Sequence, residues 1–248
     1  MAILELKEVT KTYSGFSSVV EGFNFSVNEG ELRCLIGPNG AGKTTSLDLI
    51  TGRQTLTSGA IHFDGKEISR LAERQIAGLG VGRKFQVPAV FKELSVRENF
   101  EVAQTEKRGP FQNMNLFGAK NDRKRFDEIV ELSGLGDRLS TPAGVLSHGE
   151  TQWLEIGMVL MQRPRLLLMD EPTAGMTEQE TIKTSEIFKE LKGEHTLVVV
   201  EHDMSFVRSI ADIITVMHQG KMLAEGPLSE IEEHPKVQEV YLGAEGIS

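Results

Sequence analysis

The chemistry in this chain begins with a glycine-rich stretch, GPNGAGKTT, whose spacing suits it to holding phosphate. Two glycines with four residues between them, followed by Lys43 and Thr44, have the spacing of a P-loop between an apolar strand and a helix. Glycine lets backbone amides turn inward around phosphate, and the helix start adds partial positive charge. A turn that merely caps a helix is the alternative, and the complete motif disfavours it. The predicted nucleotide-binding residues here are Gly37, Pro38, Asn39, Gly40, Ala41, Gly42, Lys43, Thr44 and Thr45.

A second stretch, RLLLMDEP, delivers two carboxylates at the end of an apolar run. We expect Asp170 to hold Mg²⁺ directly or through water, together with the Thr44 hydroxyl. Glu171 comes one residue later and points elsewhere, so it is the candidate base for an attacking water. A solvated acidic pair at a strand end is the alternative. Lys43 is expected to reach the β- and γ-phosphates of the nucleotide, beside these two acids.

Two further residues are candidates for the same site. His202 comes after the apolar run TLVVVE, and ligands bind at the carboxyl edge of parallel sheets, so we predict a γ-phosphate contact. A structural or surface histidine is the usual alternative. Gln86, within RKFQVPAV, lies where the core passes into a helical region, and its amide is a candidate sensor of Mg²⁺ or the attacking water. The predicted catalytic residues are therefore Lys43, Glu171 and His202, and the predicted metal site is Thr44, Gln86 and Asp170.

The segment VLSHGETQWLEIG opens a predicted helix far downstream of the P-loop. Ser147 and Glu150 form an S-x-x-E capping box, which explains both residues structurally. It does not explain Gly149, because glycine in a first turn weakens a helix. Glycine there suits close approach by another backbone or by a phosphate, and helix N-termini bind anions. We therefore predict a second phosphate-binding element.

The elements that position these residues belong to the α/β class. Short alternating strands and turns fill the first thirty residues, and strand–helix alternation resumes after Pro164. Helical spacing dominates the stretch between them. We expect one domain, in which residues 1–87 and 161–248 form a core with a parallel sheet covered by helices and residues 88–160 form a helical insertion. The final strands form a hairpin that turns at Gln219 and Gly220.

Composition excludes several classes of protein. The formal net charge of −9 disfavours a general nucleic-acid binder, whose phosphate contacts need a basic face. No apolar run is long enough to span a bilayer, and the N-terminus lacks a signal-peptide pattern, so a cytoplasmic location is expected. The single cysteine, Cys34, permits no internal disulfide, and its apolar neighbours predict a buried core residue.

Taken together and in this order, the motifs resemble those of the ATP-binding-cassette ATPases across nearly the whole chain. The resemblance implies a P-loop NTPase fold with a RecA-like core, an N-terminal antiparallel β subdomain and a helical subdomain that carries the segment Ser147, His148, Gly149 and Glu150, hereafter the signature segment. It implies that ATP lies between two cassettes paired head to tail, with each signature segment facing the partner's P-loop. It also implies that Tyr13 stacks on adenine, although a strand tyrosine near a turn is the simpler alternative.

A narrower resemblance is to the ATPase subunits of branched-chain amino acid and urea importers, in the phrases RKFQVPAVFKELSVRENFEVA, DEPTAGMT and HPKVQEVYLG. The phrases QWLEIGM and AGMT are most similar to the urea group. This resemblance implies a peripheral subunit on the inner face of the membrane. Its partners would be permease subunits, a second cassette ATPase or a copy of itself, and indirectly a substrate-binding protein.

Two other classes remain open from the sequence. One is a soluble cassette ATPase that acts on nucleic acid or ribosomes, and the other is a P-loop kinase. The first usually has paired cassettes or basic linkers, and the second does not need the signature segment. The chain also departs from the general cassette pattern, with His148 in place of Gly, Glu150 in place of Gln, and Thr177 where Asp is frequent.

Overall fold

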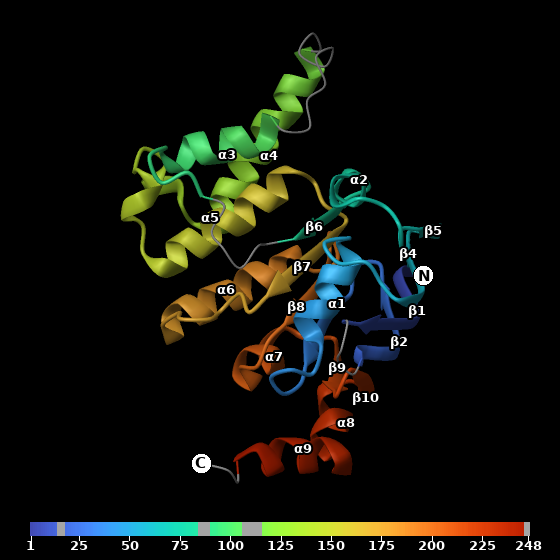
Figure 1. Ribbon diagram of the computed structural model, residues 1–248. Helices are drawn as coiled ribbons and strands as arrows, with labels where there is room; N and C mark the ends of the chain where they lie inside the picture. Colours follow the sequence, from blue (N-terminus) through green and yellow to red (C-terminus); the bar gives the residue numbers. More distant parts are fainter. Residues whose placement is uncertain (14–17, 84–89, 106–115, 246–248) are drawn as a thin grey trace.

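A mixed six-stranded sheet runs through the centre of the molecule (Figure 1). The computed structural model describes residues 1–13, 18–83, 90–105 and 116–245. In the order β10-β9-β3-β8-β7-β6, neighbouring strands from β9 to β6 pair in parallel. The strands are β3 (Leu32–Ile36), β6 (Val81–Arg83), β7 (Leu166–Asp170), β8 (Thr196–Val200), β9 (Ile213–His218) and β10 (Lys221–Gly226).

The hairpin of β9 and β10 adds an antiparallel edge to the otherwise parallel sheet. Its two-residue turn consists of Gln219 and Gly220, both with positive φ (49° and 79°). Two consecutive positive φ values are the geometry of a type I′ turn, which matches the twist of the flanking strands. The predicted parallel core is therefore confirmed, with β10 as an antiparallel addition.

A second sheet, entirely antiparallel, forms the N-terminal subdomain. Its order is β2-β1-β4-β5, and it agrees with the antiparallel subdomain expected from the sequence. Buried and exposed residues largely alternate along its long strands, as expected for a sheet with one solvent-exposed face. The strands are β1 (Ala2–Thr12), β2 (Ser18–Asn28), β4 (Ser58–Phe63) and β5 (Lys66–Glu67).

Helices cover both faces of the central sheet and form a separate layer beside it (Figure 1). Helix α1 lies on the side of the antiparallel sheet, whereas α6 and α7 lie on the opposite face. Helices α3, α4 and α5 form the helical layer. The helices are α1 (Lys43–Ile50), α2 (Glu73–Gly78), α3 (Val96–Thr105), α4 (Leu116–Ser133), α5 (His148–Met161), α6 (Glu178–Leu191), α7 (Met204–Ile210), α8 (Leu228–Glu233) and α9 (Pro235–Glu245).

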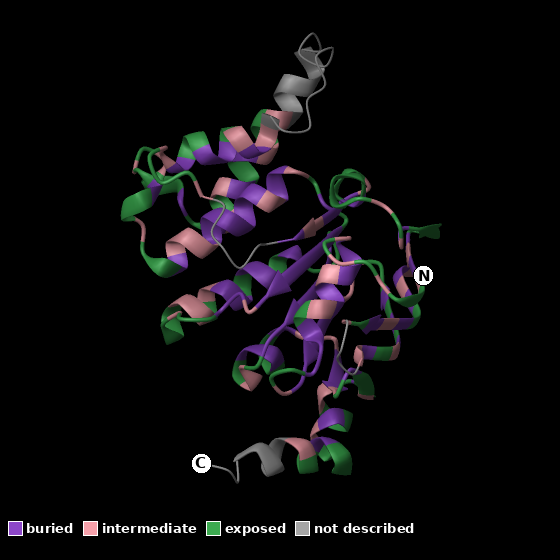
Figure 2. Cartoon of the chain, in the orientation of Figure 1, coloured by how far each residue is buried: buried purple, intermediate pink, exposed green. Residues whose placement is uncertain are grey.

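Buried residues fill the inner strands of the central sheet (Figure 2). Because strand side chains alternate between faces, the described core divides into two apolar clusters. Leu32, Cys34 and Ile36 of β3 pack toward α6 and α7, whereas Leu35 packs toward α1 and the antiparallel sheet. Cys34 is fully buried, as predicted, and burial raises the pKa of its thiol. All of β3, β7 and β8 is buried, so their carboxyl ends are held rigidly.

The helical layer has its own tight packing. The rings of Phe100 and Phe126 meet edge to face, and Gly157 lets the Phe100 ring approach α5, since a Cβ there would lie 2.6 Å from it. Helix α5 ends at Met161, close to the sequence boundary placed after residue 160. The boundary expected between residues 87 and 88 lies outside the described residues.

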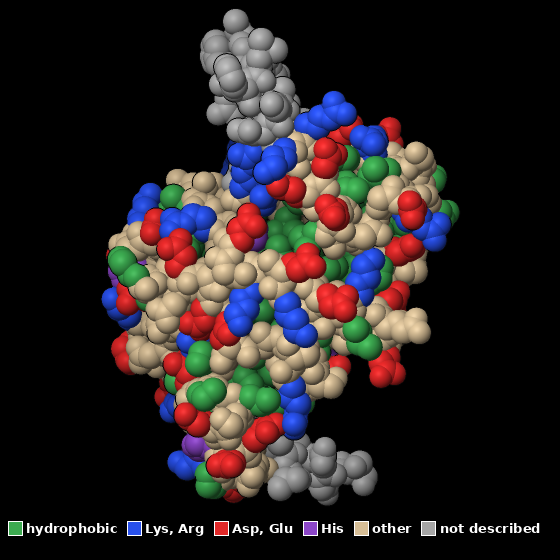
Figure 3. All heavy atoms as spheres, turned by 180° about the vertical axis from the view of Figure 1, so that it is seen from behind, with side chains coloured by type: hydrophobic (Ala, Val, Ile, Leu, Met, Phe, Trp, Pro, Cys, Tyr) green, Lys and Arg blue, Asp and Glu red, His purple; other side chains and the backbone are tan. Residues whose placement is uncertain are grey.

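The surface mixes charges of both signs. On the face in Figure 3, Lys and Arg side chains alternate with Asp and Glu, without a broad area of one sign. Within the described part of the chain, no helix is long and apolar enough to cross a membrane.

Candidate active site

The P-loop connects β3 to α1 at the carboxyl edge of the central sheet. Gly37 has a φ of 150°, and a Cβ on it would lie 2.1 Å from the carbonyl oxygen of Met217. Gly42 precedes α1 with a φ of 102°, close to the carbonyl oxygen of Val19. Only glycine fits both positions, so the loop's shape depends on them. The first amides of α1 have no acceptor within the helix and are available to an anion.

Lys43 points back into this loop. Only 8% of the residue is exposed, and its Nζ donates to the carbonyl oxygens of Gly37 (2.6 Å) and Pro38 (3.1 Å). Burial lowers the pKa of Lys43, and the nearby charges of Glu171 and Asp170 oppose that shift. Neutral carbonyls are weak partners for an ammonium group, and phosphate oxygens are stronger ones. The lysine is therefore held where an anion in the loop would meet it.

Asp170 ends β7 beneath the start of α1. Its Oδ1 accepts a long hydrogen bond from the Thr44 hydroxyl, and its Oδ2 lies 3.5 Å from an Arg83 nitrogen. Burial raises the pKa of Asp170, whereas Arg83 and the Thr44 hydrogen bond act in the opposite direction. Hard oxygen ligands such as these two suit Mg²⁺, which takes few protein ligands and completes its shell with water and phosphate. Among the described residues, no group of three or more His, Cys, Asp or Glu side chains is arranged so that it could hold a metal ion.

Glu171 follows directly and turns away from Asp170. Its backbone has a φ of 48°, which is uncommon for a residue with a side chain and is fixed by an N–H bond to the Val200 carbonyl (2.9 Å). The side chain is 40% exposed and lines one hollow together with Asn39, Lys43 and Thr44. A carboxylate facing the P-loop across open space leaves room for a water between it and a bound phosphate.

His202 stands beside Glu171 because β8 lies between β3 and β7 in the sheet. The His202 Nδ1 is 3.7 Å from the Glu171 carboxylate. The sheet thus brings the P-loop, the acid pair and the histidine to one edge, as the sequence predicts for Lys43, Glu171 and His202.

Glu201 is a residue that the sequence reasoning missed. It is completely buried, and its Oε1 accepts from the Thr173 N–H (3.1 Å) and hydroxyl (2.6 Å). Its Oε2 accepts from the backbone N–H groups of His202 (3.0 Å) and Asp203 (3.4 Å). This carboxylate therefore joins the loop after β7 to the loop after β8. An acidic residue closing the apolar run TLVVV was the available signal.

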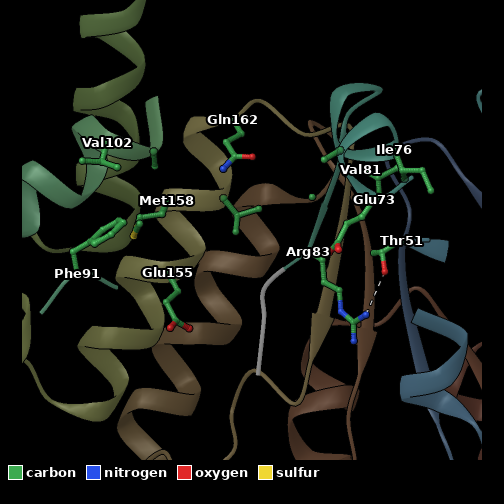
Figure 4. A pocket seen from close by; sticks show the side chains of 14 residues that line it. Thr51, Glu73, Ile76, Val81, Arg83, Phe91, Val102, Glu155, Met158 and Gln162 are labelled. Atoms are coloured by element: carbon green, nitrogen blue, oxygen red, sulfur yellow. Dashed lines mark hydrogen bonds between the residues drawn. The ribbon is translucent and has the colours of Figure 1, made fainter. Parts of the chain in front are cut away.

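Arg83, at the end of β6, is the second missed residue. The residue is only 8% exposed, and its guanidinium contacts Asp170, Asp48 of α1 and the Thr51 hydroxyl. It also lines an apolar groove between the core and the helical layer (Figure 4). We call this the subdomain groove; it is lined by Thr51, Glu73, Ile76, Ala77, Val81, Gly82, Arg83, Phe91, Val102, Ala103, Glu155, Met158, Val159 and Gln162.

One predicted residue, Gln86, lies outside the described residues. A second, Tyr13, is described but is not joined to this site. The ring of Tyr13 lies 4.8 Å from the Lys11 ammonium nitrogen, and among the described contacts none links it to the P-loop.

The signature segment forms the predicted capping box at the start of α5. The Ser147 hydroxyl accepts from the Glu150 N–H (3.1 Å), and the Glu150 carboxylate accepts from the Ser147 N–H (2.9 Å). Glu150 also pairs with Arg138 at 3.0 Å, which partly offsets the charge that it adds there. The His148 Nε2 donates to the Ala174 carbonyl (2.9 Å). Within the described contacts, the segment reaches the α6 side of the molecule and not its own P-loop.

Comparison with known proteins agrees with this geometry. A family model described as ABC transporter matches residues 20–174, and one described as branched-chain amino acid ATP-binding cassette transporter matches residues 221–247. The high-affinity branched-chain amino acid transport ATP-binding protein BraF of Pseudomonas aeruginosa is 38% identical, over 97% of this chain and 98% of its own. The corresponding LivG protein of Escherichia coli is 36% identical, over 90% of this chain and 91% of its own.

Solved structures show the same fold. The ATP-binding cassette MJ1267 in its ADP conformation superposes with a TM-score of 0.85 at 31% identity, over 98% of this chain and 99% of that one. A dimeric post-hydrolysis structure of the cassette MJ0796 with ADP and phosphate has a TM-score of 0.76 at 27% identity, over 91% of this chain and 98% of that one.

Proposed function

Because the chain belongs to the ABC transporter family and is one of its ATPases, we propose that it powers the import of branched-chain amino acids through a membrane permease. The observation that carries the hydrolytic part is the placement of Glu171, which faces the P-loop beside His202 and next to Asp170. The named relatives favour branched-chain amino acids over the urea suggested by the sequence phrases.

Nucleotide binding rests on the P-loop. The backbone amides of Gly37–Thr45 hold the phosphates of ATP, and Lys43 exchanges its two carbonyl partners for the β- and γ-phosphate oxygens. Tyr13 stacks on the adenine ring. Thr44 and Asp170, together with the predicted ligand Gln86, would hold Mg²⁺, which would supply positive charge to the phosphates.

Hydrolysis rests on the side chains at the sheet edge. Glu171 accepts a proton from water as that water attacks the γ-phosphorus, and the bond to the bridging oxygen breaks to leave ADP and phosphate. Lys43 and His202 stabilise the charge that develops on the transferred phosphoryl group. An imidazole ring carries at least one N–H group in either protonation state, so His202 can donate a hydrogen bond to that group.

The signature segment acts on the nucleotide of a partner. Two cassettes pair head to tail, and Ser147, His148, Gly149 and Glu150 of each chain complete the site built on the other's P-loop. The partner is a second cassette ATPase or another copy of this chain. Support comes from the separation of the two phosphate-binding elements within one chain and from the dimeric relative.

Contact with the permease is assigned to the subdomain groove. Ile76 and Val81 from the core face Phe91 and Met158 from the helical side (Figure 4). These side chains form an apolar surface on which a permease segment would pack. Attachment there places the chain on the cytoplasmic face of the membrane, and the substrate-binding protein acts on it only through the permease. The acidic net charge and the interspersed surface charges disfavour the alternative action on nucleic acid or ribosomes.

The hydrolytic assignment is tested by Glu171→Gln. The amide keeps the size of the side chain but cannot accept the proton, so ATP should bind with near wild-type affinity and turnover should fall at least about a hundredfold. Steady-state ATPase assays and ATP calorimetry measure the two effects, and Glu178→Gln, an exposed change on α6, is the control. Turnover near the wild-type rate would remove Glu171 from its role.

The substrate assignment needs the assembled transporter. In vesicles containing the permease and its binding protein, leucine should stimulate ATP hydrolysis and urea should not. Stimulation by urea alone would reverse the choice between the two solutes and leave the ATPase assignment intact.

A further inference from the structure

The start of the signature helix is already in contact with an anion that belongs to the chain itself. Glu180, in the first turn of α6, points its Oε1 at the signature segment. That oxygen accepts hydrogen bonds from the Ser147 hydroxyl (3.1 Å) and from the Gly149 N–H (3.2 Å). The start of α5 therefore binds a carboxylate in the isolated chain.

The second oxygen of the same carboxylate caps α6. It accepts from the Thr177 N–H (2.9 Å) and from the Thr177 hydroxyl (3.0 Å). These hydrogen bonds, foremost that from the Thr177 backbone, lower the pKa of Glu180, so the group is ionised at neutral pH. One negative charge thus bridges the positive ends of two helices, α5 in the helical layer and α6 on the core.

Gly149 makes this approach possible. A Cβ at that position would lie 2.4 Å from the Glu180 Oε1, which is closer than any real contact. The space left by the missing side chain was interpreted above as room for another backbone or a phosphate. In this structure the Glu180 carboxylate occupies that space. The fit is therefore specific to a small acceptor group that lies directly against the backbone.

The two donors cannot serve two anions at once. The Ser147 hydroxyl and the Gly149 N–H each carry one hydrogen, and both already point at Glu180. The pairing proposed above requires the same groups for the partner's ATP. A carboxylate about 3 Å from these donors would also repel an incoming phosphate.

We propose that Glu180 is an internal competitor at the signature segment, which holds the phosphate position of the isolated chain and must be displaced before a partner's ATP binds there. This inference rests on the head-to-tail pairing under the proposed function. It deepens that function by naming a step that regulates closure of the paired site.

Displacement does not require α5 and α6 to separate. The Trp153 indole N–H donates to the Thr184 hydroxyl (3.0 Å) and His148 holds the Ala174 carbonyl, so the two sides remain joined by other contacts. Glu180 is partly exposed at the surface. Its side chain can therefore turn toward water while the helices stay in place.

The test uses the full chain in a Glu171→Gln background, in which ATP persists. Sedimentation velocity gives the Mg-ATP concentration that converts half of the monomer to dimer. Glu180→Gln removes the charge and keeps an acceptor oxygen, and Glu180→Asp keeps the charge but is too short to reach both helices. Each should lower that concentration about tenfold, which corresponds to about 1.4 kcal/mol.

Glu178→Gln is the matched control, because it removes the same charge from the same exposed first turn and should leave the half-conversion concentration within about twofold. Thermal melts followed by circular dichroism establish that each variant is folded. An unchanged or higher concentration for Glu180→Asp would overturn the competitor role and leave Glu180 as an ordinary helix cap. If the parent forms no dimer with ATP, the pairing itself fails, and this inference with it.

Discussion

Replacing Glu201 with glutamine tests how strongly the loops after β7 and β8, which carry the proposed catalytic residues Glu171 and His202, depend on one buried carboxylate. Both of its oxygens accept hydrogen bonds, two from Thr173 and two from the backbone of His202 and Asp203. In Glu201→Gln, one oxygen becomes an NH₂ group that must face donors. The less costly orientation turns it toward Thr173, whose hydroxyl can reverse and accept, while the Thr173 N–H loses its partner.

The size of the effect follows from that geometry. A buried donor left without an acceptor costs about 1–3 kcal/mol, and the remaining bonds weaken because they lose the charge. Relief from burying a charge offsets part of this loss. We expect the free energy of unfolding to fall by about 2 kcal/mol, which for a chain of this size lowers Tm by about 4–8 °C.

Turnover should fall further than stability alone explains. Glu201 fixes the relative position of the loops that carry Glu171 and His202, and a displacement of about 1 Å costs up to about a hundredfold in rate. None of its described hydrogen bonds reaches the P-loop, so KM for ATP should change less than about twofold.

Calorimetric melts and steady-state ATPase assays measure the two effects of Glu201→Gln. Glu194→Gln is the control, since the Glu194 side chain is 72% exposed and makes one ion pair, 3.6 Å from Arg125. That change should cost less than about 0.5 kcal/mol. A Tm within about 1 °C of wild type together with unchanged kcat would refute the reasoning.

Two further predictions concern the partner arrangement and pH. Chains carrying Lys43→Ala or Ser147→Arg should be inactive alone, but an equal mixture should recover about a quarter of wild-type activity, because half of the dimers are mixed and each has one intact site. ATPase assays after verified mixing measure this, and the absence of rescue would argue against head-to-tail pairing. Burial lowers the pKa of His195, whose Nδ1 lies 2.7 Å from the Pro164 carbonyl. The unfolded chain therefore takes up that proton first, so stability is lost as pH falls below about 6.5. Urea unfolding titrations at several pH values measure this effect. The free energy of unfolding should fall less steeply with decreasing pH in His195→Asn than in the wild type, and equal slopes would contradict the assignment of this loss to His195.

Local patterns allowed the sequence to predict much of this fold. The P-loop lies between β3 and α1 because glycine spacing and apolar runs are local signals. The capping box at Ser147 is likewise local, as is the hairpin turn at Gln219 and Gly220. The periodicity gave no prediction for α2, α8 or α9, which are short or end the chain.

Of the two missed site residues, Arg83 acts through partners that are distant in the chain. Arg83 meets Asp48 and Asp170, which lie 35 and 87 positions away. Such pairings depend on the strand order of the folded sheet, so composition and spacing do not predict them. For Gly149 the pattern indicated a close approach, but only the packing of α6 against α5 identifies Glu180 as the group that approaches.

The position of Arg83 links the candidate nucleotide site to the subdomain groove. Its guanidinium lies 3.5 Å from the carboxylate of Asp170, the proposed Mg²⁺ ligand, and its side chain lines the subdomain groove. A partner segment that shifts this cation changes the free energy of whatever Asp170 holds. Thermodynamic reciprocity then requires the nucleotide to change the affinity of the groove for its partner by the same factor. If the groove holds the permease as proposed, the affinity for the permease and the affinity for the nucleotide are coupled through Arg83.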